Sequence, residues 1–279
     1  MMDKHFLHMI PLILFTTLAI TATGLLIGIG FLSIANTPYP EVKTLFLLSF
    51  GLIGIGTLLS LFHLGKKKRF VFAISGLKHS WLSIEVILAA MVSGLSGATF
   101  MLLNTHSSES LIDLTAMASI VCGLLLVLSI GMVYHIPIRP TWKGFSNIGS
   151  ALFSSLLLGA YLFFFTYKTY VALGMFLLIW LIDYFMAMIR AKALLNLMHN
   201  EHGFVFPHLL RPVNWLYTTR QFIPFVTLIL ARIFFHTPTL IMLITTILID
   251  RLCFYGSMSE TSPKSVIATL KKERLSEPF

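Results

Sequence analysis

The sequence FLHMIPLILFTTLAITATGLLIGIGFLSIA, from Phe6 to Ala35, contains no Asp, Glu, Lys or Arg. At a rise of about 1.5 Å per residue, a helix of this length can cross a hydrocarbon core about 30 Å thick. The run lacks the polar–apolar alternation of a barrel strand, and it is longer than the apolar core of a signal peptide, which has about 7–15 residues. It therefore predicts an uncleaved transmembrane helix.

The rest of the chain repeats this pattern. Hydrophobic residues make up 57% of it and charged residues 11%, whereas an ordinary globular domain has about 25% charged residues. We predict an all-α polytopic membrane protein of about eight transmembrane helices in two four-helix bundles, over residues 1–256, followed by a polar basic tail over 257–279. The helices are expected near 6–35, 43–64, 79–103, 111–135, 147–167, 169–192, 220–236 and 238–256, and the longest loop at 196–219.

The Lys and Arg residues are concentrated in alternate loops, and the net charge is +9. Because cytoplasmic loops are enriched in these residues, the pattern predicts that both termini are cytoplasmic and that this side is a basic platform. We count Arg190, Arg220 and Arg251 among its members. Anionic lipid accounts for such a platform, and a docking surface for an acidic partner is the alternative.

Two polar residues flank the same predicted loop. His63 ends the second predicted helix, and Glu85 lies about two turns into the third. A carboxylate near an imidazole can accept protons and bind a ring oxygen, as quinol oxidation requires. Lys78, Trp81 and Glu85 have the spacing of one helical stripe. In the structural alternative, Lys78 merely neutralises Glu85 and His63 is an interfacial cap.

Other ionisable residues lie within predicted spans, where such groups are costly. We expect Asp183 to pair with Arg190 or with Arg232, and Asp250 to pair with Arg251 at a helix end. If instead Asp183, Glu85 and Arg232 formed a midplane site, the chain would be a secondary transporter.

The cysteines and histidines argue against a bound metal. Cys122 and Cys253 lie in apolar runs without a ligand motif, and we expect both to be buried. Apart from His63, the histidines lie at helix ends or in loops, so neither a haem nor a metal is expected in this chain. Motifs for phosphate binding or hydrolysis are absent from the sequence, and the chain is not expected to catalyse a reaction alone.

Two short motifs resemble a known family. They are HLGKKKR, from His63 to Arg69, and SWLSIE, from Ser80 to Glu85. The patterns H-L-G-x-x-x-R and S-x-L-S-x-E are similar to those of the membrane anchor subunit of bacterial dimethyl sulfoxide reductases and related molybdoenzymes. The length and the number of predicted spans agree with this resemblance, which covers nearly the whole chain.

The resemblance implies a multi-pass protein of the bacterial inner membrane that oxidises menaquinol in anaerobic respiration. Its expected partners are an iron–sulfur electron-transfer subunit, a molybdopterin catalytic subunit and membrane lipid, and no nucleic acid. The implied quinol-binding residues are His63, which binds a ring oxygen, and Glu85, which takes a proton. Trp81 and Ser83 belong to the same site, and Arg69 and Lys78 are expected to tune the acid or to contact a partner. A purely structural anchor without quinol chemistry is the remaining alternative.

Overall fold

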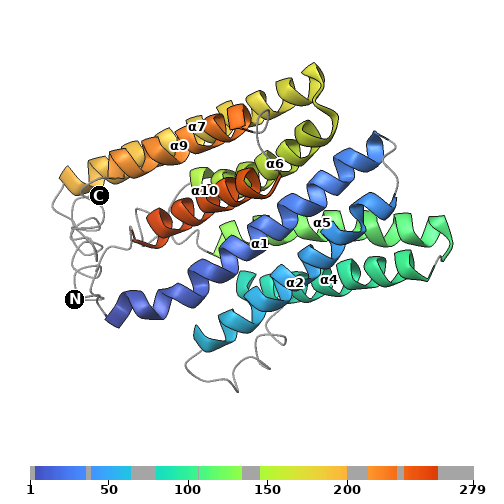
Figure 1. Ribbon diagram of the computed structural model, residues 1–279. Coiled ribbons are helices and arrows are strands. Elements are labelled where there is room, and N and C mark those ends of the chain that lie inside the picture. Colours follow the sequence, from blue (N-terminus) through green and yellow to red (C-terminus); the bar gives the residue numbers. More distant parts are fainter. Residues whose placement is uncertain are drawn as a thin grey trace, which may run out of the picture.

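The computed structural model describes residues 4–35, 39–63, 80–105, 107–133, 145–199, 213–230 and 236–256. Within these residues every regular element is a helix, and Figure 1 shows their arrangement. The eight helices are α1 (Lys4–Ile34), α2 (Tyr39–His63), α4 (Trp81–Asn104), α5 (Glu109–Val133), α6 (Phe145–Tyr167), α7 (Tyr170–His199), α9 (Val213–Leu230) and α10 (His236–Gly256). The predicted all-α architecture is confirmed.

The helices form two groups of four. In the first bundle α1 contacts α2, α2 contacts α4, α4 contacts α5, and α5 returns to α1. The second bundle closes in the same way through α6, α7, α9 and α10. The bundles meet where α1 contacts α6 and α10, and where α5 contacts α6. In Figure 1, α1 runs between the two groups, so the N-terminal run that identified the membrane protein is also its central helix.

Close backbone approach joins the two bundles along α1 and α6. A Cβ added at Gly28 would lie 2.7 Å from Leu162 Cδ1, and one added at Gly159 would lie 3.0 Å from the Gly28 backbone nitrogen. Gly24 and Gly28 have the G-x-x-x-G spacing that allows helix backbones to approach closely in membranes. Accordingly, 83% of the apolar window of α1 is buried, compared with 28% for α2.

Six of the helices described are long and apolar enough to cross a membrane: α1, α2, α4, α5, α6 and α7. Large apolar side chains cover their outer faces, including Leu58, Leu114 and Met117, which are 62%, 65% and 67% exposed. Exposed apolar side chains of this size are favourable in contact with lipid and unfavourable in contact with water. The protein is therefore a multi-pass membrane protein.

The predicted helix ends were wrong around the longest loop. Helix α7 continues to His199, and α9 begins at Val213, so the loop predicted at 196–219 is helical at both ends. The residues after Arg190 include Ala, Lys, Leu and Met, which are strong helix formers, and the helix continues through them beyond its apolar segment. The predicted tail, 257–279, lies outside the described residues, as does Arg232.

Candidate functional site

Two polar features lie at the same end of the molecule. Consecutive helices run antiparallel, so α2 ends and α4 begins at the end where α7 and α10 also finish (Figure 1). The first feature is the α2–α4 hairpin, which carries His63 and Glu85. The second is an arginine–aspartate cluster in the second bundle, formed by Asp183, Arg190, Arg220, Asp250 and Arg251.

Helix α4 begins at Trp81, directly after an extended Ser80 with φ −134° and ψ 115°. The Ser80 carbonyl accepts hydrogen bonds from the backbone N–H groups of Ser83 and Ile84, at 3.0 and 3.3 Å. Glu85 is four residues beyond Trp81, and thus about 6 Å along the helix axis. It therefore lies nearer the helix start than the predicted two turns.

Glu85 faces the core of the first bundle. Its exposed fraction is 3%, and it begins a buried stripe at helical spacing that continues through Ala89, Val92, Ser96 and Thr99. Its Oε2 atom is buried and has no hydrogen-bond partner among the described residues. A buried carboxylate oxygen without a partner is costly, so this oxygen is open to a proton, a ligand or a side chain outside the described residues.

The other predicted site residues are only partly described. Ser83 is buried, with 2% exposed, whereas Trp81 is 46% exposed and does not share the buried environment of Glu85. His63 is the last residue of α2. The His63 side chain, and Arg69 and Lys78 altogether, lie outside the described part of the chain. Their predicted roles stay predictions.

The arginine–aspartate cluster is centred on Asp250 of α10. Its Oδ1 accepts hydrogen bonds from Arg190 and from Ser150 Oγ, the latter at 3.1 Å, and lies 3.2 Å from Arg220 Nε. The other oxygen, Oδ2, accepts from Arg251, whose Nε lies 3.0 Å away. Four helices are therefore linked through one carboxylate, because Ser150 belongs to α6, Arg190 to α7 and Arg220 to α9.

Arg220 extends the cluster to a second carboxylate. Its Nη2 donates to Asp183 Oδ1 and to Ser154 Oγ, both at 3.1 Å. Arg190 also donates to Ser150 Oγ, at 2.8 Å. Every charged member is at most 2% exposed. Buried ion pairs with this many hydrogen bonds hold helices in a defined arrangement more than they add net stability.

This cluster corrects the predicted positions of three arginines and the predicted partner of Asp183. Arg190, Arg220 and Arg251 were expected on the basic platform, but all three are buried and bound to carboxylates. Asp183 pairs with Arg220 instead of Arg190. A count of Lys and Arg in each loop could not reveal these ion pairs, because the predicted loop placed Arg220 at a helix end. The ion pair between Asp250 and Arg251 was predicted and is confirmed.

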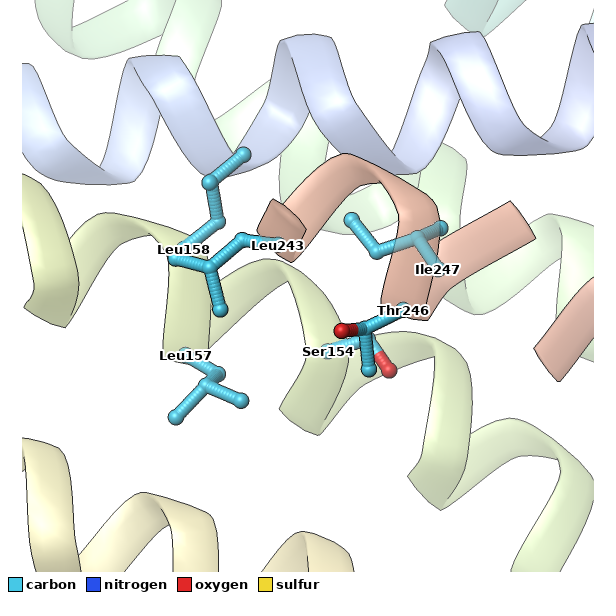
Figure 2. A pocket seen from close by; sticks show the side chains of 6 residues that line it. All are labelled: Ser154, Leu157, Leu158, Leu243, Thr246 and Ile247. Carbon is cyan, nitrogen blue, oxygen red and sulfur yellow. The ribbon is translucent and has the colours of Figure 1, made fainter. Parts of the chain in front are cut away.

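A small pocket lies beside the cluster, between α6 and α10. Figure 2 shows its lining, in which Ser154 and Thr246 provide hydroxyl groups and the rest is apolar, namely Leu157, Leu158, Leu243 and Ile247. The space has room for about one water molecule. The pocket is therefore too small for a quinone ring.

Membrane-crossing helices in two bundles define the general class as an integral membrane protein, and two buried polar features lie near one end of it. Its family is narrower. The chain belongs to the DMSO reductase anchor subunit (DmsC) family, whose model matches residues 2–251. The matched interval contains Glu85, the whole arginine–aspartate cluster and all eight helices except the end of α10 beyond Arg251. The resemblance noted from two short motifs is confirmed. Comparisons with curated proteins and with solved structures gave no match.

Proposed function

We propose that the chain is the membrane anchor and menaquinol-oxidising electron-transfer subunit of a molybdopterin oxidoreductase of the dimethyl sulfoxide reductase type. It serves anaerobic respiration in the bacterial inner membrane, together with an iron–sulfur subunit and a catalytic subunit. Family membership supports the anchor role. The single observation that supports quinol chemistry is the buried Glu85 Oε2 without a partner among the described residues.

The proposed chemistry removes two electrons and two protons from the quinol. His63 hydrogen-bonds one ring oxygen and takes the proton of that hydroxyl, and Glu85 accepts the proton of the other ring hydroxyl as the two electrons leave. Both electrons pass to the iron–sulfur partner, and the ring departs as a quinone. Ser83, which is buried like Glu85, belongs to the proposed site, and the exposed Trp81 lies at its margin. Arg69 and Lys78 tune the acid or contact the partner.

The transporter alternative has less support. It required Asp183, Glu85 and Arg232 in one midplane site, but Asp183 lies in the second bundle, bound to Arg220, and Glu85 lies in the first. Transporter sites usually occur where spanning helices are discontinuous. The six membrane-crossing helices described here run unbroken, and Glu85 lies close to a helix start.

The test is oxidation of a menaquinol analogue by membranes that contain the intact complex. Glu85→Gln keeps the size and hydrogen-bonding ability of the side chain but removes the basic oxygen. Because a positioned general base contributes about 100-fold or more, we expect quinol-driven turnover to fall by that factor. Turnover with an artificial donor at the catalytic subunit should stay unchanged, which verifies assembly.

The matched control is Glu109→Gln, because Glu109 is an exposed acid at the start of α5. It should retain full quinol oxidation. His63→Arg is measured in parallel and should lose turnover as Glu85→Gln does. If Glu85→Gln and His63→Arg both keep normal turnover, the quinol site is elsewhere or the chain only anchors the complex.

A further inference from the structure

Helices α9 and α10 carry three of the five charged side chains in the arginine–aspartate cluster. They are Arg220 on α9, and Asp250 and Arg251 on α10. The relative exposed fractions of these residues are 0%, 0% and 2%. The charges of both helices are thus enclosed by protein, and their placement in the bilayer depends on neighbouring helices.

Both helices carry charged side chains that lipid disfavours. Arg220 lies near the middle of α9, and Asp250 and Arg251 lie in the second half of α10. Arg and Asp within a helix oppose its insertion further.

The partners that offset these charges lie on helices made earlier in the chain. Asp183 and Arg190 of α7 bind Arg220 and Asp250 respectively, and Ser150 of α6 donates to Asp250. Taken together, α9 and α10 still hold two arginines and one aspartate. Association of α9 with α10 alone therefore leaves two arginines to share one aspartate. Helix α7 adds one charge of each sign, Asp183 as the partner of Arg220 and Arg190 as a further partner of Asp250.

We propose that α9 and α10 are held in the membrane conditionally, as a pair docked on α6 and α7, with Asp250 as the anion that joins the four helices. The cluster is then a built-in assembly device. The second half of the second bundle becomes stable only after its first half is in place. The first bundle does not depend on this step, because its helices are apolar enough to cross unaided.

The two native cysteines provide the readout in the full-length chain. Cys253 is on α10 and 2% exposed, and Cys122 is on α5 and 8% exposed. A charged maleimide applied to open membranes labels a cysteine only when water reaches it. In Asp250→Asn we expect labelling of Cys253 to be faster by about tenfold or more, because the arginines lose their central anion. Labelling of Cys122 should stay at the wild-type rate.

A reporter on α9 completes the measurement. Phe222 is 61% exposed on the outer face of α9, so Phe222→Cys should be protected by lipid in the otherwise native chain and become labelled when combined with Asp250→Asn. Asp113→Asn, which neutralises an exposed acid on α5, is the control and should change none of the rates.

A double variant distinguishes charge imbalance from a general packing defect. Arg190→Gln combined with Asp250→Asn removes one charge of each sign and keeps the net charge of the cluster at its native value. We expect Cys253 to be labelled more slowly in the double variant than in Asp250→Asn. If Asp250→Asn accumulates poorly in the membrane, the double variant should accumulate to a higher level. The proposal is overturned if Cys253 in Asp250→Asn is labelled at the wild-type rate, or if labelling of Cys122 rises as much as that of Cys253. It is also overturned if Cys253 is no better protected in the double variant than in Asp250→Asn.

Discussion

At the scale of single residues, two buried carboxylates near the same end of the molecule differ in their partners. Asp250 is bound by Arg190, Arg220 and Arg251, whereas Glu85 Oε2 has no partner among the described residues. A carboxylate held by three guanidinium groups joins helices and serves the structure. The Glu85 carboxylate, which lacks such contacts among the described residues, is the one that we propose for proton transfer.

Removing Arg220 should therefore be costly. Arg220→Met leaves Asp183 without its arginine and weakens the neutralisation of Asp250, so we expect a loss of about 3–5 kcal/mol in stability. Thermal unfolding of the purified protein in detergent measures it. Lys43→Met is the control, because Lys43 makes an exposed hydrogen bond to Asn104 at 2.9 Å, and it should cost less than about 1 kcal/mol. Equal shifts in Tm for the two variants would contradict the assigned role of Arg220.

The sequence allowed part of this residue-level picture to be predicted. Glu85 could be identified because an acid inside an apolar run is conspicuous by itself. The pairing of Arg220 with Asp183 could not, because it depends on how helices far apart in the sequence pack. Arg190, Arg220 and Arg251 resemble ordinary loop residues until α6, α7, α9 and α10 surround them.

At the scale of helices, the α1–α6 interface determines how the bundles fit together. Gly24 and Gly28 on α1 face Leu158 and Gly159 on α6 with little space for a larger side chain. Membrane helices lack a hydrophobic driving force for association, so close backbone contact is a main source of their attraction. These glycines fix the spacing between the bundles.

Gly159→Leu should separate α1 from α6. A Cβ at Gly159 would lie 2.7 Å from Ile27 Cγ2 and 3.0 Å from the Gly28 nitrogen, and a backbone atom cannot move aside easily. Overpacking of this kind costs about 1–3 kcal/mol, measured as the free energy of unfolding in a denaturing detergent titration. Gly51→Leu is the matched control, because nothing lies within 4 Å of a Cβ there. A cost for Gly51→Leu as large as that for Gly159→Leu would be inconsistent with this interface.

Hydropathy alone predicted the existence of all eight helices, since each contains an apolar run. It failed at the end of α7, which continues over residues 193–199, and at the start of α9, which begins seven residues before Arg220. Arg190 and Arg220 lie close to these two helix extensions and bind carboxylates inside the second bundle. Apolar length predicts where a helix lies in lipid, but not where protein contacts extend it.

At the scale of the whole molecule, the two bundles carry different polar features at one end. The first bundle contains the Glu85 site that we propose for the quinol, and the second contains a saturated ion network. Both lie where α2, α7 and α10 finish (Figure 1). In the function that we propose, electrons leaving a quinol at this end would have a short route to an iron–sulfur partner docked on the same surface.

The most direct test is to locate the bound quinone. A photoreactive menaquinone analogue is irradiated with the intact complex, and the labelled peptides are identified by mass spectrometry. We expect labelling at the end of α2 and over the first turns of α4, around Trp81 to Ala89, with loss of the label in Glu85→Gln and its retention in Glu109→Gln. Labelling confined to α6 and α10 beside Ser154 and Thr246, undiminished by Glu85→Gln, would contradict this expectation.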